Sequence, residues 1–238
     1  MLEVEPGRVL RVALEFVAQP PGPPRVRLCT AASKLLGSAG VAVSVGVSDD
    51  LFDSGLQTVC ATDGGRDGET LQFDLGEGPS YTAHRTGWSV QVADLERDDT
   101  CPVFAQAATA LGLRAVFAFP LRSGLVSLGA LTLYQRVAGA LTREQHADAL
   151  AVARFALDLL TSIQAGCPPD ALDPVFTDGM ARTEKVSRAS GIVAVQLGIP
   201  VGAALAVLRA HAFAQACSLD TVATQVIEHR LTLGPLQD

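Results

Sequence analysis

Five basic side chains in the last third of the chain have the types and spacing needed to contact phosphate groups. Arg182, Lys185 and Arg188 recur at three-residue intervals, so on a helix they share one face. Arg209 and His211 fall on a second predicted helix and add one full and one partial positive charge. Because cationic groups bind phosphate oxygens, these five residues are the candidate interface with a nucleic-acid backbone.

The overall charge limits how such an interface can work. The chain carries 18 Lys and Arg against 25 Asp and Glu, which gives a formal net charge of −7. A protein that coats phosphate backbones needs the opposite balance, so any contact with nucleic acid must be local. Residues 178–238, which include the five candidates, hold five basic and five acidic side chains and are therefore neutral.

Other phosphate-binding and catalytic patterns are missing from the sequence. A phosphate-binding loop ends in Gly-Lys-Ser/Thr, whereas neither of the two lysines, Lys34 and Lys185, follows a glycine. The glycine-rich run at 64–68 is therefore interpreted as a solvated turn. The four histidines lack HxxxH spacing, and no nucleophile can be paired with a base. We expect no enzyme activity, no metal site and no cofactor.

Three further features have a functional and a structural interpretation. The acidic residues between 94 and 99 surround Arg97, and we interpret them as a solvated, helix-capping loop rather than as a cation site. Cys101 is interpreted as a loop cysteine at a helix start rather than as a haem ligand. Trp88 could stack on a ligand in a pocket or cover the core, and the sequence leaves both open.

The cysteines and the N-terminus favour a cytoplasmic protein. Five scattered cysteines without a CxxC pair suggest neither a disulfide framework nor a zinc site, so we expect reduced thiols. Early acidic residues argue against a secretory signal. The stretch Ala189–Leu208 carries no charge over 20 residues, but Gly198 and Pro200 mark a helix end, so we expect no membrane span.

The first two thirds of the chain mix predicted helices and strands. Residues 18–24, Ala-Gln-Pro-Pro-Gly-Pro-Pro, predict a semi-extended spacer, and we expect the fold to start after it. Two apolar runs joined by a short loop predict an antiparallel hairpin, and the mixture indicates an α+β fold. The predicted helices are 26–36 and 104–111; the predicted strands are 41–47, 56–61, 90–93, 114–120 and 126–134; turns or loops are expected at 48–50 and 74–79.

A long helix is predicted from Thr142 to about Gln164. It begins with a capping box, in which Thr142 and Gln145 cap each other's backbone. Its apolar residues cover more than one stripe, so it needs a second partner besides a sheet. Residues 166–170, Gly-Cys-Pro-Pro-Asp, end it, and three helices are predicted beyond, at 172–197, 200–216 and 218–231.

Landmark residues rich in Gly, Pro and apolar side chains are spread between residues 26 and 165. They are the run 71–79 (LQFDLGEGP), Asp94-Leu95, Phe104, Gly112-Leu113-Arg114, Phe119-Pro120-Leu121 and the run 128–134 (LGALTLY). They resemble a GAF domain of the actinobacterial GAF–ANTAR type. The resemblance implies a sensory domain, an antiparallel sheet flanked by helices, that can bind a small molecule and dimerise. The cyclic-nucleotide signature of other GAF domains is not found.

A second set of residues follows the long helix. They are Val186, Ala189, Gly191, Ile192, Gly198, Ala204, Leu208-Arg209, Ala212, Leu219, Val222, Ala223, Val226 and Ile227. They are similar to the ANTAR domain, a three-helix module that binds RNA hairpins in nascent transcripts and prevents termination. Arg209 matches the Arg of that family's Leu-Arg pair. The predicted domains are thus an N-terminal segment and spacer at 1–25, a GAF domain at 26–165, a linker at 166–171 and an all-α ANTAR domain at 172–238.

The resemblances lead to one hypothesis and one alternative. We hypothesise a cytoplasmic, signal-responsive antitermination regulator whose GAF domain controls RNA binding by its ANTAR domain. Because few phosphate contacts are available, tight binding should require a homodimer, which we expect to form through the apolar helix at 142–164. The alternative is a ligand-binding or interaction module whose ANTAR part has lost RNA binding, as its neutral charge suggests.

Overall fold

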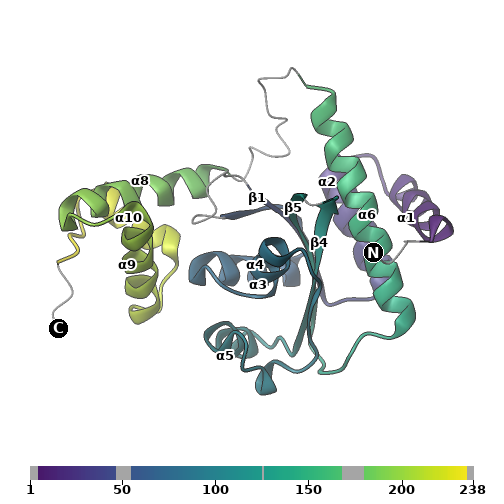
Figure 1. Cartoon of the computed structure of the whole chain (residues 1–238), viewed down its shortest axis with the longest axis horizontal. Helices are drawn as coiled ribbons and strands as arrows, with labels where there is room; N and C mark the ends of the chain where they lie inside the picture. The colour runs from purple at the N-terminus through teal and green to yellow at the C-terminus, as the bar shows by residue number, and fades with distance from the viewer. Residues whose placement is uncertain (1–4, 47–54, 125, 168–179, 235–238) are drawn as a thin grey trace.

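The computed structural model describes residues 5–46, 55–124, 126–167 and 180–234 (Figure 1). The turn predicted at 48–50, the linker beyond residue 167, the helix start predicted at 172–179 and the last four residues lie outside these ranges. The described elements are α1 (Pro6–Ala18), α2 (Pro24–Leu36), β1 (Gly40–Gly46), β2 (Leu56–Ala61), α3 (Asp63–Leu75), α4 (Pro79–Thr86), β3 (Val90–Val92), η1 (Leu95–Arg97), α5 (Pro102–Ala110), β4 (Ala115–Ser123), β5 (Val126–Gln135), α6 (Arg143–Ala165), α8 (Met180–Leu197), α9 (Val201–Ala214) and α10 (Leu219–Ile227). We call α1 to α6 with the strands the N-terminal unit, and α8 to α10 the C-terminal helical unit.

Among the described residues, five strands form one antiparallel sheet in the order β2-β1-β5-β4-β3. β4 and β5 pair with Phe117 opposite Leu133, which confirms the predicted hairpin. The mixture of helices with this sheet confirms the α+β class. β2 pairs with β1 alone, so it is an edge strand whose other edge faces away from the sheet.

Helices cover both faces of the sheet (Figure 1). α2 and α6 lie on one face, where Leu28, Phe117 and Leu157 belong to the main core. α3, α4 and α5 lie on the other face, where Phe104 and Tyr134 are fully buried. The sheet is therefore the middle of three layers, and its faces provide the core of the N-terminal unit.

Several local end signals are confirmed. The capping box of α6 is present, with both of its hydrogen bonds between Thr142 and Gln145. Ser218 caps α10, and its side chain accepts a hydrogen bond from the Thr221 backbone N–H. The acidic loop at 94–99 starts with a capped turn, and Cys101 immediately precedes α5, as interpreted. These signals act within four residues, so the sequence alone reports them.

An N-terminal helix, α1, belongs to the fold, so the expectation that the fold starts after the spacer at 18–24 is wrong. Val12 is buried against α6, and the ring centroids of Phe16 and Phe155 lie 5.4 Å apart. The Arg8 guanidinium donates a 2.5 Å hydrogen bond to Asp148 on α6. α1 therefore supplies, within the same chain, the second partner that the apolar surface of α6 requires.

The glycine-rich run at 64–68 begins a helix, and its interpretation as a solvated turn is wrong. It lies in the first turns of α3, which also extends through Leu75 into the predicted loop at 74–79. A Cβ at Gly65 would collide with the backbone of Val41, and one at Gly68 would collide with the ring of Tyr134. Glycine is used here because α3 lies too close to the sheet for any side chain.

The C-terminal helical unit contains three described helices around a small core of its own. α8 ends at Gly198, whose φ of 65° is the left-handed conformation that glycine favours, and α9 follows Pro200. No single helix of the described residues is long and apolar enough to cross a bilayer; α8 and α9 meet that criterion only as a pair bent by 104°. The predicted helices at 200–216 and 218–231 are present with slightly shorter bounds.

Candidate functional site

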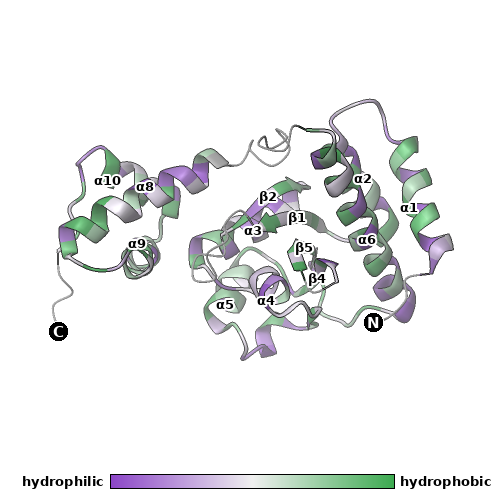
Figure 2. Cartoon of the chain, turned by 45° about the horizontal axis from the view of Figure 1, so that its top comes forward, coloured by the Kyte–Doolittle hydropathy of each residue, from purple (hydrophilic) through white to green (hydrophobic). Residues whose placement is uncertain are grey.

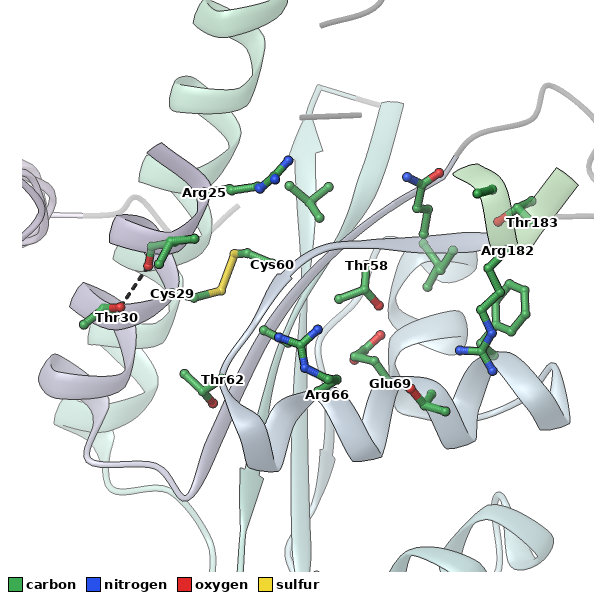
Figure 3. A pocket seen from close by; sticks show the side chains of 18 residues that line it. Arg25, Cys29, Thr30, Thr58, Cys60, Thr62, Arg66, Glu69, Arg182 and Thr183 are labelled. Carbon is green, nitrogen blue, oxygen red and sulfur yellow. Dashed lines mark hydrogen bonds between the residues drawn. A yellow bond between two sulfur atoms is a disulfide. The ribbon is translucent and has the colours of Figure 1, made fainter. Parts of the chain in front are cut away.

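A groove with a volume of about 730 Å³ runs along β2, at the edge of the sheet (Figure 3). Residues 56–62 form its floor, α2 forms one wall, and α3 forms the other. The first residues of α8 reach one end of the groove, where Arg182 and Thr183 line it. The groove therefore lies where the N-terminal unit and the C-terminal helical unit meet.

One wall of the groove contains a disulfide between Cys29 and Cys60, which joins α2 to β2 (Figure 3). The expectation of reduced thiols is thus wrong for these two residues, whereas Cys101, Cys167 and Cys217 carry thiols. The pairing joins residues separated by 31 positions and depends on how α2 packs on the sheet edge. Sequence spacing carries no information about such a pair.

Three arginines from three helices line the groove: Arg25 of α2, Arg66 of α3 and Arg182 of α8. Glu69 is the one acidic side chain among the described lining residues. Arg66 is exposed, and its side chain has no hydrogen bond or ion pair with any described residue. The groove therefore has an excess of positive charge, and guanidinium groups favour carboxylate and phosphate ligands.

The carboxylate of Glu69 is directed into the protein and is saturated there. Oε1 accepts hydrogen bonds of 2.8 Å from both Ser80 and Tyr134, and Oε2 accepts one of 2.7 Å from Ser44. The side chain is 3% exposed. Gln72 completes the network, with its amide nitrogen 2.6 Å from the Tyr134 hydroxyl. Since its oxygens accept these hydrogen bonds, Glu69 keeps its negative charge but forms no ion pair with the described arginines of the groove.

This network fills the space between α3, α4 and the sheet with hydrogen-bonded polar groups. Ser44, Gln72, Ser80, Thr132 and Tyr134 are each fully buried. Burial, and the negative charge of Glu69 beside it, raise the pKa of the Tyr134 hydroxyl well above its ordinary value. The hydroxyl therefore stays protonated and acts as a donor to Glu69. The network holds α3 in place below the groove.

The end of α3 holds the C-terminal helical unit. Arg182 donates a 2.6 Å hydrogen bond from Nη2 to Asp74, and its guanidinium carbon lies 4.5 Å from the centroid of the Phe73 ring. Phe73 also packs against the core of the C-terminal helical unit. Two residues beyond Asp74, the guanidinium of Arg209 lies against Gly76, where a Cβ would collide with it. The end of α3 and the glycine that follows it thus contact α8 and α9.

The carboxyl group of Asp74 is largely buried in this contact. Burial raises the pKa of its carboxyl above 3.8, although Arg182 and a hydrogen bond from the Leu219 backbone act in the opposite direction. The carboxyl is thus poorly solvated even though it has partners. Its position beside α8 and at the start of α10 makes it the polar centre of the contact between the two units.

A pH dependence follows from the Asp74 shift. Because its folded-state pKa is raised above 3.8, its contribution to stability is fully present below that pH and is lost as the pH rises through the raised value. We expect the unfolding free energy of the wild type to fall, relative to Asp74→Asn, as the pH rises from 3.8 towards neutrality. Urea unfolding of both proteins across this range measures the difference, in which the other carboxylates cancel. A difference that is constant with pH would contradict the assignment.

Comparisons with known proteins identify the fold of the N-terminal unit. No protein-family model matches the sequence, and no curated protein matches it. Among solved structures, the chain is similar to the GAF domain of an Acinetobacter phosphoenolpyruvate-protein phosphotransferase, with a TM-score of 0.50 and 10% identity over 71% of this chain and 100% of that one. The N-terminal unit has the GAF fold. We therefore call it the GAF unit.

Two further solved structures are similar at lower scores. The GAF domain of a phosphoenolpyruvate-protein phosphotransferase from Coxiella burnetii has a TM-score of 0.49 and 14% identity, covering 67% of this chain and 94% of its own. A GAF domain/HD domain protein from Geobacter sulfurreducens has a TM-score of 0.45 and 16% identity, covering 59% and 92%. At such identities the likeness concerns the fold alone, and the function of this chain has to be argued from its own residues.

The five candidate RNA-binding residues have different surroundings. Arg182 is turned towards the GAF unit, and Lys185 donates to both carboxylate oxygens of Asp220, at 2.8 and 3.0 Å. Arg188 is exposed and makes no hydrogen bond or ion pair within the described part of the chain, whereas Arg209 and His211 are half-buried. Two residues of the predicted basic stripe, Arg182 and Lys185, therefore make ion pairs within the chain.

Apart from Arg182, the charged residues that line the groove carry no signal in the sequence that marks them as a site. Arg25 and Arg66 are surface-type residues on separate helices, and nothing in the sequence brings them together. A signal was available for α3, where Gly65, Gly68 and Gln72 recur at helical spacing and so describe a small, polar face that packs closely. Within the described residues, no group of three or more His, Cys, Asp or Glu side chains could hold a metal ion.

Proposed function

We propose that the chain is a signal-responsive regulator in which the GAF unit binds a small molecule and thereby controls the C-terminal helical unit. One observation carries the proposal: α3 lines the groove with Arg66 and Glu69 and, at its end, holds the C-terminal helical unit through Phe73 and Asp74. A ligand that shifts α3 or Arg182 changes that contact. The proposal places the protein in the cytoplasm and assigns it no reaction.

The C-terminal helical unit supplies the output in this proposal. Residues 172–232 resemble the ANTAR domain, and three of the described helices fall in that range. We propose that this unit binds RNA hairpins in nascent transcripts and acts in transcription antitermination. Arg188 is available for a phosphate contact, while Arg182 and Lys185 are engaged with Asp74 and Asp220. Release from the GAF unit would add Arg182 to the exposed cations.

The test is selection of RNA by the purified chain at two salt concentrations. Enrichment of short paired hairpins supports the proposal, whereas sequence-indifferent binding that salt abolishes counts against it. Arg188→Glu should lower RNA affinity and reduce the slope of its salt dependence by roughly 0.7 to 0.9 for each phosphate that is no longer neutralised. Arg85→Glu, a charge reversal on the exposed surface of α4, is the matched control and should leave both unchanged.

A triple charge reversal of Arg182, Lys185 and Arg188 is a poorer test of the RNA contact. It would also break the ion pairs with Asp74 and Asp220. The single change at Arg188 breaks no ion pair or hydrogen bond of the described chain, so a lower RNA affinity reports on the RNA contact itself.

A second candidate function is an interaction module whose C-terminal helical unit binds no RNA. The observation that favours it is the intramolecular use of the cations: Lys185 is paired with Asp220, Arg182 with Asp74, and Arg209 lies against Gly76. In this case the contact between α3 and the C-terminal helical unit is permanent. The RNA selection separates the two functions, because an Asp74→Ala variant with a released unit would still bind no hairpin.

We propose a homodimer, with α1 as its contact surface together with the predicted helix at 142–164. Part of α6 is covered by α1, whereas Leu10, Leu14 and Val17 of α1 are 60%, 63% and 70% exposed. These residues recur at helical spacing and form an outward apolar stripe, on the helix that lies outermost in the GAF unit (Figure 2). A second copy of the chain would remove this apolar surface from water.

The dimer proposal predicts that Leu10→Glu with Leu14→Glu yields a monomer, because two charges cannot be buried in an apolar contact. Static light scattering of wild type and variant measures the mass directly. Trp88, which is 73% exposed and lines a second groove beside α1, does not cover the core, so its fluorescence should change when the dimer dissociates. A monomeric wild type at the concentrations of the RNA assay would contradict the proposal.

A further inference from the structure

We propose that the groove along β2 binds an elongated small molecule with an anionic group, carboxylate or phosphate, at each end. The inference rests on the proposed function, since it names the ligand class of the sensory site. Arg66 would bind one anionic end and Arg182 the other, with Arg25 adding positive charge from the opposite wall (Figure 3).

The charge of the groove selects for an anion. Three guanidinium groups line it against one carboxylate, that of Glu69, and Arg182 has a second carboxylate partner in Asp74, so positive charge remains in excess. The Glu69 oxygens already accept hydrogen bonds from Ser44, Ser80 and Tyr134. Arg66 has no partner of its own among the described residues. An anionic group placed beside Arg66 would therefore form a charge-assisted hydrogen bond without displacing an existing one.

The spacing of the arginines selects for an elongated ligand. Arg66 and Phe73 are seven residues apart on α3, which corresponds to roughly 10 Å along a helix. The guanidinium carbon of Arg182 lies 4.5 Å from the centre of the Phe73 ring, so it marks the far end of that interval. This spacing along α3 favours a molecule with two separated anionic groups over a single small anion.

The groove between the two ends is suited to a neutral, polar middle. Thr58 and Thr62 line the floor and Thr70 the wall, so hydroxyl groups lie along the groove between its two ends. A hydroxyl group both donates and accepts hydrogen bonds, so these threonines suit hydroxyl or carbonyl groups in the middle of the ligand. The floor, residues 56–62, contains no arginine, so the middle of the ligand needs no negative charge there.

Binding at the Arg182 end would act on the C-terminal helical unit. Arg182 already donates to Asp74, and its Nε is buried without a hydrogen-bond partner. A ligand anion at this guanidinium would compete with Asp74 for it and weaken the hold of α3 on α8. The contact between the two units is thus itself part of the binding site.

The experiment is isothermal titration calorimetry of the full chain, which measures its affinity for linear dicarboxylates from succinate to sebacate. Monocarboxylates of the same lengths and inorganic phosphate serve as single-anion probes, and fructose 1,6-bisphosphate serves as the bisphosphate probe. We expect affinity to rise with the separation of the two carboxylates up to an optimum, and the matched monocarboxylates to bind at least about tenfold more weakly. The bisphosphate arm shows whether phosphate or carboxylate ends are preferred.

Two variants locate the site. Arg66→Gln and Arg182→Gln should each weaken the best dianion at least about tenfold, while Arg85→Gln on exposed α4 should not change its affinity. Arg182→Lys keeps the positive charge and should therefore bind the dianion more tightly than Arg182→Gln. This comparison separates loss of the charge from release of the C-terminal helical unit as the cause of weaker binding. Amide exchange of α8 should accelerate when the dianion binds.

Three results would overturn the proposal: no dianion binds, single anions bind as well as dianions, or Arg66→Gln leaves the affinity unchanged. These failures are distinct from failure of the proposed function. If Asp74→Ala alters hairpin binding while no dianion binds, the coupling between the units stands and the ligand class is wrong. If a dianion binds but no hairpin does, the ligand class stands and the RNA output is wrong.

Discussion

Replacing Gly65 by alanine is expected to destabilise the GAF unit by about 3 kcal/mol, the upper range for an overpacked core. The added methyl group would collide with backbone atoms of Val41 on β1, and a backbone cannot move aside as a flexible side chain can. The whole of α3 would have to retreat from the sheet. The groove wall and the contact at Asp74 would move with it.

Urea unfolding followed by circular dichroism measures this loss. Gly7→Ala in α1 is the matched control, because a Cβ there meets nothing within 4 Å. The control should be neutral or more stable by roughly 0.5 to 1 kcal/mol, since alanine is the better helix former. Equal effects of the two substitutions would show that α3 does not approach β1 as closely as described.

Reducing the disulfide between Cys29 and Cys60 is expected to lower the unfolding free energy of the GAF unit by about 3 to 4 kcal/mol, from the chain entropy that a cross-link over a sequence separation of 31 removes from the unfolded state. Reduction should also free α2 to move away from β2, because the bond ties the groove wall to its floor. We therefore expect weaker binding of any groove ligand after reduction.

The measurement compares urea unfolding with and without a phosphine reductant. Cys29→Ser should be less stable than the wild type and insensitive to the reductant, while Cys101→Ser, at a cysteine outside the disulfide, should behave as the wild type. Mass spectrometry after thiol alkylation counts the free thiols in each state. Full alkylation of Cys29 in the native, unreduced protein would contradict the pairing.

The elements that the sequence determined are those whose signals lie within a few residues. Alternating valines predicted β1, paired apolar runs predicted the β4–β5 hairpin, and Thr142 and Ser218 marked the starts of α6 and α10. Capping and hairpin pairing are short-range interactions, so the residues that form them are close in the sequence as well as in space. The α+β class followed from these elements.

The site is formed by contacts between residues that are far apart in the sequence and meet only in the folded chain. Arg25, Arg66 and Arg182 come from three helices, Cys29 meets Cys60 across the sheet edge, and Asp74 meets Arg182 between two units. Each partner taken alone has the sequence context of an ordinary surface residue or of a scattered thiol. Arg182, a candidate contact with RNA, pairs with Asp74 in the structure.

The same division explains the two errors of the fold prediction. The Pro-rich residues after α1 do form an irregular segment, but the helix before them belongs to the fold; the glycines at the start of α3 are a local signal for irregular backbone that packing overrules. α1 is stabilised by burying Val12 on α6, and α3 needs its glycines in order to lie on β1. Apart from proline, the intrinsic helix propensity of a residue differs from that of alanine by about 1 kcal/mol or less. Burying a large apolar side chain contributes roughly 1.5 to 3 kcal/mol. The tertiary contacts of α1 and α3 therefore outweigh the local signals.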